Sequence, residues 1–328
     1  MAGQNSAPVL AADIGGTKIL TAILSSRGRM LAKDVCSTLA DEGVSSVIER
    51  LCASIDNLLN GNDFKPSNLA GIGIACAGAI DAARGVITTS PNLPEWSDVP
   101  LAGLLAERYG VDTYLVNDAS AAALGEHRFG VGKGLRNLVM LTLGTGIGGG
   151  IIIDGELYLG ASGSAAEMGH MIIDVNGPEC PCGSKGCLEV FASGKAVARD
   201  AAMRIRQGEK SSLVDMVQGR LEEITAGKVG AAARNGDALA LDVLSRAAYY
   251  LGIGLVNLVN IFNPEMIIIG GGMAEQAEFL LEPARQVVAA GAFPISAQAV
   301  RIVPAKLGNE AGVYGAAAYA FDRTKRRS

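Results

Sequence analysis

Two stretches of the chain share one pattern of apolar positions. Residues 9–24 are typical of an apolar strand, a short glycine–threonine turn and a second apolar strand, and residues 138–153 repeat this order. Each pair continues through a polar turn, at residues 25–29 and 154–155, into a third strand. Consecutive strands joined by tight turns form a β-meander. The repeat predicts two similar lobes, each built around one meander, which face one another across a cleft.

Helical patterns fill the intervals between these strands. Apolar residues recur at helical spacing over residues 44–59, and a proline and a glycine bound a second helix at 100–109. Further helices are predicted from Asp118, from Ser193 to Arg206, from Asp237 to a point before Pro264, over 274–290 and over 309–322. Strand-like runs at 113–116 and 266–269 alternate with these helices. The alternation predicts an α/β fold.

Length, charge and cysteine content narrow the class of protein. A chain of 328 residues with 49% hydrophobic content can bury the cores of two lobes. The formal net charge of −5 argues against a protein that binds nucleic-acid phosphates, and six cysteines do not resemble a secreted disulfide scaffold. Residues 1–8 lack the pattern of a leader peptide, and no run reaches the roughly 18 apolar residues of a membrane span. We expect a soluble cytoplasmic protein with neither nucleic-acid nor membrane partners.

Residues 167–189 contain a candidate metal site. One imidazole and three thiols are the donors that a tetrahedral zinc ion takes. These donors are His170, Cys180, Cys182 and Cys187. A redox pair of cysteines would not need the histidine, and a zinc knuckle for nucleic acid would need a basic patch. Zinc leaves two neighbouring carboxylates, Glu167 and Glu189, unused. We expect a closed zinc site that shapes a pocket, in which these acids hold a polar substrate.

The first meander turn contains residue types suited to phosphate. Glycines let backbone N–H groups approach a phosphate closely, and hydroxyl and ammonium groups add hydrogen bonds. The candidates are Asp13, Gly15, Gly16, Thr17 and Lys18. Among them Asp13 is suited to hold a magnesium ion through water. The alternative is an ordinary hairpin with glycine where φ must be positive.

The second meander turn, with Gly144, Thr145 and Gly146, matches a dinucleotide fingerprint only in form. That fingerprint must lead into a helix, whereas isoleucines at 151–153 continue a strand here. Two glycine–threonine turns instead suggest a nucleoside triphosphate held from both lobes. Gly271 and Gly272, between a strand and a helix, are a third place where the backbone can approach the ligand, such as its adenosine.

Asp118 opens a predicted helix directly after a strand. An aspartate in this position is most often an N-cap. It is also placed to act as a general base that takes the proton of an attacking hydroxyl, and the two roles can coexist. Asn92, Asn117 and the two glutamates named above supply the donors and acceptors that bind sugar hydroxyls.

Four motifs in order resemble the ROK family of sugar kinases. They are Asp-Ile-Gly-Gly-Thr-Lys at 13–18, Leu-Gly-Thr-Gly-Ile-Gly-Gly-Gly at 143–150, Glu-Met-Gly-His at 167–170 and Cys-Pro-Cys-Gly-Ser-Lys-Gly-Cys-Leu-Glu at 180–189. The resemblance runs from about residue 9 to residue 320. It implies a two-lobed actin-like ATPase fold of the hexokinase and Hsp70 type, with duplicated cores of meander plus helices. A small lobe would contain residues 1–118 and the closing helix at 309–328, and a large lobe residues 119–308.

The resemblance also implies roles, position by position. Asp118 matches the catalytic base. The positions that match sugar contacts are Gly78, Asn92, Asn117, Asp118, Glu167, His170 and Glu189. By the same resemblance, we expect the zinc to be structural, His170 both to bind it and to face the sugar, and magnesium to accompany ATP. A homodimer or homotetramer is the usual assembly.

The resemblance favours transfer of the ATP γ-phosphate to the 6-hydroxyl of glucose. N-acetylmannosamine kinases of the family usually have arginine after the sugar-loop glycine, where this chain has Ala79, and residues 293–298 resemble those of ROK glucokinases. N-acetylmannosamine or fructose is the alternative substrate. An acidic chain disfavours polyphosphate as donor. A sugar-responsive repressor of the family would need an N-terminal helix-turn-helix domain, for which residues 1–8 leave no room.

Overall fold

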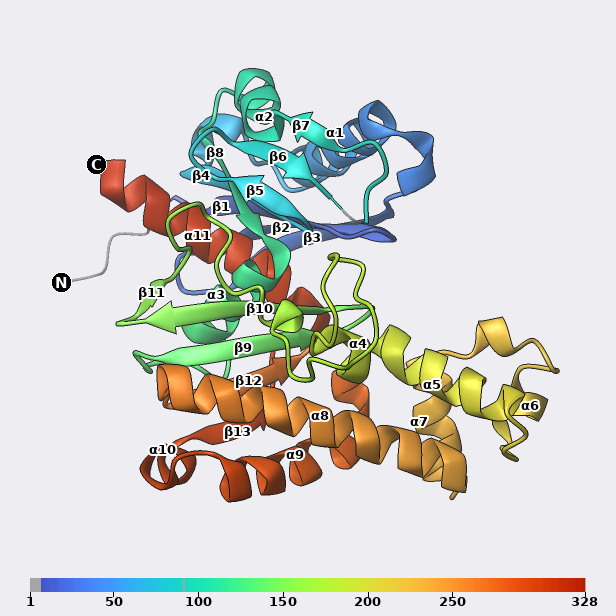
Figure 1. Ribbon diagram of the computed structural model, residues 1–328. Coiled ribbons are helices and arrows are strands. Elements are labelled where there is room, and N and C mark those ends of the chain that lie inside the picture. Colours follow the sequence, from blue (N-terminus) through green and yellow to red (C-terminus); the bar gives the residue numbers. More distant parts are fainter. Residues whose placement is uncertain (1–6, 91, 328) are drawn as a thin grey trace. The chain divides into compact units, whose positions relative to one another are not determined.

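The computed structural model describes residues 7–90 and 92–327, so most of the segment compared with a leader peptide lies outside the described residues. The chain forms two compact units (Figure 1). The first contains Met1–Leu135, Gly150–Ala166 and Lys306–Ser328, and the second contains Arg136–Gly149 and Glu167–Ala305.

The first unit is built on a five-stranded sheet of order β3-β2-β1-β4-β8. Its strands are β1 (Val9–Ile14), β2 (Lys18–Leu24), β3 (Met30–Ser37), β4 (Gly71–Cys76) and β8 (Thr113–Asn117). The first three form an antiparallel meander, and β4 and β8 extend it in parallel. One face packs on α1 (Val44–Gly61) and α2 (Leu101–Tyr109), the other on α11 (Ala311–Arg327). Every residue of β4 is buried, because this strand lies inside the sheet and helices cover both of its faces.

A small three-stranded sheet in the same unit holds the loop that contains Asn92. Its strands are β5 (Ala79–Asp81), β6 (Val86–Thr89) and β7 (Ser97–Val99). Leu93 and Trp96 of the loop are buried in the core of the unit. The sheet begins directly after Gly78, so it fixes the positions of both predicted sugar contacts.

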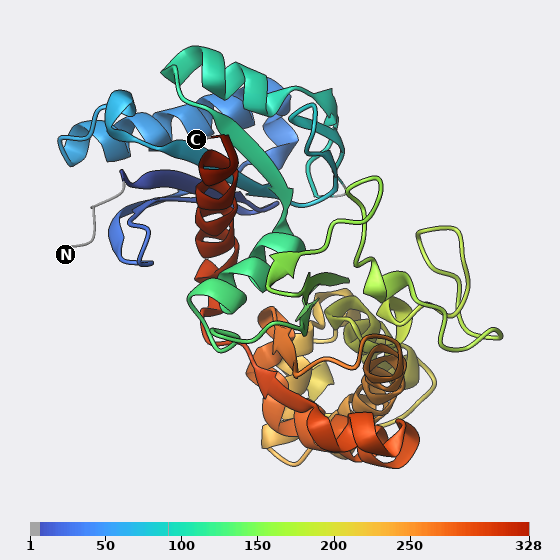
Figure 2. The ribbon, with the colours of Figure 1, turned by 90° about the vertical axis from the view of Figure 1, so that its left-hand side faces the viewer.

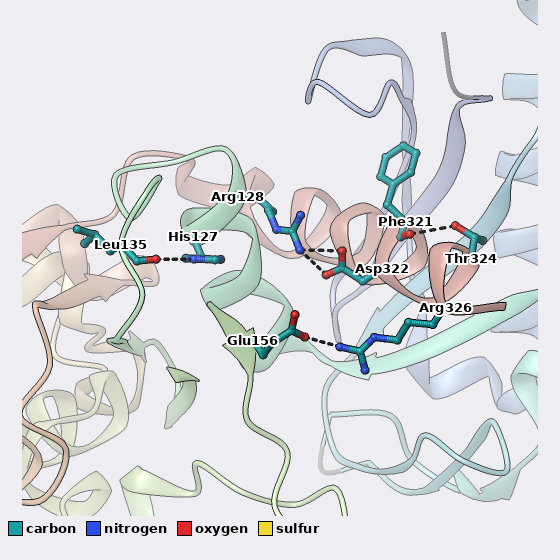
Figure 3. Close-up of polar contacts among 8 residues, drawn as sticks. All are labelled: His127, Arg128, Leu135, Glu156, Phe321, Asp322, Thr324 and Arg326. Carbon is teal, nitrogen blue, oxygen red and sulfur yellow. Dashed lines mark hydrogen bonds and ion pairs between the residues drawn. The ribbon is translucent and has the colours of Figure 1, made fainter. Parts of the chain in front are cut away.

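Helix α3 (Asp118–Arg128) packs against α11 and crosses it at an angle, as Figure 2 shows. A Cβ atom on Gly315 would lie 1.6 Å from the Ala121 carbonyl oxygen, so only glycine allows this close approach. Arg128 donates hydrogen bonds of 2.7 and 2.6 Å to the Asp322 carboxylate across the two helices (Figure 3).

Two side chains in the last turn of α3 also form hydrogen bonds with the loop that follows α3 and with the segment that precedes α11. Glu126 is fully buried, and its carboxylate accepts the backbone N–H groups of Val131, Lys306 and Leu307 at 2.9, 2.7 and 2.6 Å. The Nε2 atom of His127 lies 2.9 Å from the Leu135 carbonyl oxygen (Figure 3). Backbone hydrogen bonds thus compensate the burial of the glutamate.

The second five-stranded sheet has the order β11-β10-β9-β12-β13. Its strands are β9 (Leu138–Leu143), β10 (Ile147–Ile153), β11 (Glu156–Leu157), β12 (Met266–Gly270) and β13 (Arg301–Pro304). The order repeats that of the first sheet, with β12 parallel to both β9 and β13. The chain passes from the second unit to the first within β10, at Gly150. The duplication predicted from the two apolar patterns is confirmed.

The second unit contains most of the remaining helices. They are α4 (Glu189–Ala192), α5 (Gly194–Arg206), α6 (Leu213–Met216), α7 (Ala226–Arg234), α8 (Ala238–Phe262), α9 (Ala277–Gly291) and α10 (Pro294–Ala299). Among the described helices, α8 alone is long and apolar enough to pass for a membrane span. Buried residues occur along its length and it packs on α9, as expected of the core helix of a globular unit.

Predicted boundaries differ from the structure by a few residues at several places. The helix predicted from residue 274 begins at Ala277 and is preceded by a 3-10 helix, η5 (Gly272–Gln276). The closing helix runs to Arg327, because its polar last turns continue beyond the apolar pattern. The third strand of the second meander, for which the apolar pattern predicts residues 156–159, ends at Leu157.

Candidate active site

The first glycine turn joins β1 to β2 and is held by hydrogen bonds on its inner side. The Gly15 N–H donates to the Lys18 carbonyl at 3.0 Å, and the buried Thr38 hydroxyl donates to the Gly15 carbonyl at 2.7 Å. A Cβ atom on Gly16 would lie 3.1 Å from the Asn92 carbonyl oxygen, so the turn packs against the loop of the small sheet. Thr17 and Lys18 are exposed. Their hydroxyl and ammonium groups are available to a ligand.

Asp13 lies at the end of β1 in an environment that disfavours its charge. The pKa of Asp13 is raised to about 7: burial is the largest cause, the negative charge of Asp118 adds to the rise, and Lys18 partly opposes it. A Cβ atom on Gly312 would lie 2.3 Å from the Asp13 Oδ2 atom, so the first turn of α11 contacts the carboxylate. A bound cation would offset the unfavourable burial of this charge.

Asn117, and not Asp118, is the residue that caps α3. Its Oδ1 atom accepts the N–H groups of Ala119 and Ser120 at 3.0 and 3.1 Å. Asp118 accepts the Ala119 N–H, at 2.9 Å through Oδ1. Burial raises the pKa of Asp118, and the backbone hydrogen bond from Ala119 partly offsets the shift. The sequence left two roles open for Asp118, N-cap of α3 and general base. The capping role is filled mainly by Asn117.

Gly78 connects the cap to the sugar loop. Its φ is +120°, and a Cβ atom would lie 2.1 Å from the Thr89 carbonyl oxygen, so no other residue fits. Its carbonyl accepts a hydrogen bond of 3.2 Å from the Asn117 Nδ2 atom. The first unit therefore brings together, through these contacts, Asp13, Gly16, Gly78, Asn92, Asn117 and Asp118.

The second glycine turn, between β9 and β10, carries a carboxylate. Glu189 Oε2 accepts the Ile147 N–H at 2.8 Å, and a Cβ atom on Gly146 would lie 2.2 Å from the same oxygen. The Gly144 N–H is bonded within the turn, to the Gly146 carbonyl at 2.9 Å. One oxygen of Glu189 thus braces the turn, which the sequence did not indicate.

The 3-10 helix η3 (Met168–His170) packs on the same strand end. A Cβ atom on Gly169 would lie 2.1 Å from the Ile147 carbonyl oxygen. Glu167, at the start of this helix, is exposed, and His170 is half-buried. Glu167, His170 and Glu189 are therefore gathered around the first residue of β10.

The four predicted zinc donors lie together. All four ligand atoms are within 4.8 Å of one another, with 3.6 Å from Cys180 Sγ to His170 Nδ1 and 3.7 Å from Cys182 Sγ to Cys187 Sγ. Ligands of a tetrahedral zinc ion are about 3.5–3.8 Å apart. A backbone hydrogen bond from Ser184 lowers the pKa of Cys182 to about 7, whereas burial raises that of Cys187 to about 12. The donor set and its spacing fit zinc, which would stabilise all three thiolates.

A cavity of about 600 Å³ in the second unit adjoins the second glycine turn. Gly144, Thr145 and Gly272 line it, as expected for nucleotide contacts. Gly271, with φ of +82°, packs on the Leu143 carbonyl and brings η5 to this turn. The cavity is also lined by residues that no motif indicated, among them Lys195, Ile224, Thr225, Met273 and Gln276. For these residues the sequence offers one indication, which is that Thr225 precedes a helix. Its hydroxyl accepts the Lys228 N–H as an N-cap.

The duplicated sheets, the two glycine turns and the buried acid at the end of the first strand define a protein of the actin-like ATPase fold. A sequence model of the ROK family matches residues 9–323, and the chain belongs to this family.

Three relatives illustrate the range of the similarity. The glucokinase of Thermotoga maritima is 38% identical over 96% of this chain and 98% of its own length. The crystal structure of a ROK family glucokinase from Streptomyces griseus with glucose and AMPPNP superposes with a TM-score of 0.82 at 34% identity, over 96% of this chain and 99% of that one. The xylose repressor of Caldicellulosiruptor bescii is 32% identical over 94% of this chain but 76% of its own length.

Proposed function

We propose that this protein is a glucokinase, which transfers the γ-phosphate of ATP to the 6-hydroxyl of glucose. Near full-length similarity to glucokinases, one of them solved with glucose and an ATP analogue, supports the reaction. The observation that carries the mechanism is that Asn117 caps α3 and leaves Asp118, with a raised pKa, as a base beside Asp13.

In the proposed reaction, the sugar oxygen attacks the γ-phosphorus in line. The new O–P bond forms as the bond from the γ-phosphorus to the β-phosphate oxygen breaks, and the hydroxyl proton passes to the Asp118 carboxylate. The leaving group departs as ADP. The exposed Thr17 and Lys18 would stabilise charge on the phosphoryl oxygens. Magnesium brought with ATP would be held at Asp13 and would neutralise part of the phosphate charge.

The proposed sugar contacts are the residues that the resemblance to the ROK family implies. Asn92, Asn117 and Gly78 are the proposed contacts in the first unit, and Glu167, His170 and Glu189 those in the second. The zinc would orient His170 through its Nδ1 atom and leave Nε2 toward the sugar. Gly15, Gly16, Gly144, Thr145, Gly146, Gly271 and Gly272 are the proposed backbone contacts of ATP.

Substitution of the proposed base provides the main test. Asp118→Asn should lower kcat by about 10²–10⁴-fold without unfolding, since the cap on Asn117 remains. The measurement is glucose phosphorylation with a thermal melt as the control for folding. Asn117→Asp is a matched variant, which keeps a capping oxygen but loses the hydrogen bond to Gly78; it should raise KM for glucose more than it lowers kcat. Near wild-type turnover of Asp118→Asn would reject the assignment.

The zinc proposal is tested by metal analysis of the purified protein. We expect about one zinc ion per chain, and its loss from Cys187→Ser, together with a rise in KM for glucose. Cys52→Ser is the control, because this buried thiol lies on α1 in the first unit, outside the cluster. Active protein that contains no zinc would contradict the proposal.

Sugar preference is settled by kcat/KM for glucose, N-acetylmannosamine and fructose, and the donor by comparison of ATP with polyphosphate. We expect glucose and ATP. The lobe division at 118 and 308, a soluble cytoplasmic protein and a homodimer or homotetramer stay predictions from the sequence.

A further inference from the structure

A buried amide in the second unit lines the cavity beside the second glycine turn. Gln276, the last residue of η5, is 2% exposed. Its side chain lines the 600 Å³ cavity, and its buried Oε1 atom has no hydrogen-bond partner within the described part of the chain. A buried acceptor without a donor is unfavourable, so native proteins usually supply its partner from protein, water or ligand.

Helix α7 is shaped to hold this side chain in place. A Cβ atom on Gly230 would lie 2.6 Å from Gln276 Cγ and 2.9 Å from Nε2, so a helical glycine provides the room for the amide. One turn later on α7, Arg234 donates to the Glu275 carbonyl at 2.6 Å and to the Glu278 carboxylate at 2.7 Å. The glycine and the arginine together fix the backbone and the side chain of Gln276 against α7.

The rest of the cavity suits a flat aromatic ring. Ile224 and Met273 are apolar and almost fully buried, and Ala198 and Ala226 add small apolar surfaces. The glycine turn at Gly144 and Thr145 adjoins one part of this wall. An aromatic base between apolar side chains, with one polar group to fix its orientation, is the usual composition of such a site.

We infer that Gln276 determines the preference for adenine, because its Oε1 atom accepts a hydrogen bond from the exocyclic 6-amino group of the base. Adenine presents a donor at this position, whereas hypoxanthine and guanine present a carbonyl oxygen, which would face the amide oxygen unfavourably. The inference rests on the proposed use of ATP and adds the residue that selects it.

The test removes the hydrogen bond from either side. Wild-type protein is assayed with ATP and with purine riboside triphosphate, which has hydrogen in place of the 6-amino group. We expect kcat/KM to fall about tenfold with the analogue, mainly through KM. Gln276→Leu should lose about the same factor with ATP and show no further loss with the analogue, as a double-mutant cycle requires.

Met273→Leu is the matched control, because it changes the same cavity without removing a hydrogen-bonding atom. It should shift both nucleotides alike and keep the tenfold ratio. A ratio that Gln276→Leu leaves unchanged overturns the inference. So does a wild-type preference for inosine triphosphate over ATP, since the amide nitrogen would then face the base.

Two further measurements separate this inference from its premises. If Gln276→Leu does not fold, equal kcat/KM of the wild type for ATP and purine riboside triphosphate still overturns the role of Gln276. If the wild type phosphorylates no sugar, the proposed function fails, and equilibrium binding of ADP against purine riboside diphosphate tests Gln276 alone. The inference is supported if the wild type binds ADP more tightly than purine riboside diphosphate and if Gln276→Leu binds the two equally.

Discussion

The two meanders have the same strand order but different chemistry. The comparison concerns the second-to-last residue of the first strand in each meander. Asp13 of β1 pairs with Ala75 of the parallel strand β4, and Thr142 of β9 pairs with Gly270 of the parallel strand β12. The first position holds a carboxylate whose pKa is raised to about 7, and the second holds a neutral hydroxyl. At this position the duplicated backbone therefore carries an acid in the first unit and a hydroxyl in the second.

The turns that follow these residues differ as well. The first leaves Thr17 and Lys18 exposed beside Asp13. In the second, Glu189 accepts the Ile147 N–H and covers Gly146, and the metal-binding segment is attached to the same strand. The difference suggests that the first unit supplies charged groups for the reaction, whereas the second supplies a braced turn and a rigid wall.

Replacement of Asp13 and of Thr142 by residues of similar size should give the largest difference in kcat. Asp13→Asn removes the carboxylate proposed to hold magnesium, and we expect kcat to fall a hundredfold or more, on the order of one lost electrostatic contact in a transition state. Thr142→Val should change kcat by less than about threefold, roughly 0.7 kcal/mol. Steady-state assays at saturating ATP and magnesium measure both. Equal losses would mean that the two positions do not differ in function.

The same aspartate should make stability depend on pH. Its folded pKa of about 7 exceeds the reference value of 3.8, so the folded state binds this proton more tightly than the unfolded state. Protonation of Asp13 therefore contributes to the free energy of unfolding. This contribution is fully present below pH 4 and is lost as pH rises through 7. Relative to wild type, Asp13→Asn should therefore gain about 2–3 kcal/mol in free energy of unfolding between pH 5 and pH 8.

Urea unfolding without nucleotide or magnesium measures this gain. Thr142→Val is the control and should keep the pH dependence of the wild type. A difference between Asp13→Asn and wild type that does not change with pH would contradict the raised pKa of Asp13.

The two glycines of the second turn offer the smallest and most local test. Gly146→Ala must displace the Glu189 carboxylate and break its bond to the Ile147 N–H, which should cost about 1 kcal/mol. Gly144→Ala meets no atom within 4 Å and should be neutral or slightly stabilising. Thermal unfolding distinguishes the pair. In a Glu189→Ala background the two substitutions should become equivalent, and a persistent difference would show that the brace is not its cause.

Local patterns predicted the elements and the motifs, and distant contacts completed the site. Glycine turns and apolar strands placed both meanders, and the histidine–cysteine spacing predicted a cluster that the structure assembles. No local pattern shows that Gly312 contacts Asp13 across the length of the chain, or that Gly230 makes room for Gln276. β4 carries no alternation to detect, because both of its faces are buried.

The capping of α3 shows how neighbouring polar residues compete. Asn117 and Asp118 are both good N-caps, so propensity alone cannot decide between them. The strand β8 extends through Asn117 and pairs it with Cys76, which fixes where the helix begins. Tertiary pairing of the strand thus decided which side chain became the cap.

The anchoring of residues 306–307 by Glu126 has a consequence for synthesis on the ribosome. Every residue of the second unit precedes Lys306, whereas the first unit needs Lys306–Ser328 to satisfy Glu126 and to cover its sheet with α11. The unit that is translated first is therefore the last to be completed. A nascent chain that still lacks α11 therefore exposes one apolar face of the first sheet, a surface that favours aggregation until the helix packs on it.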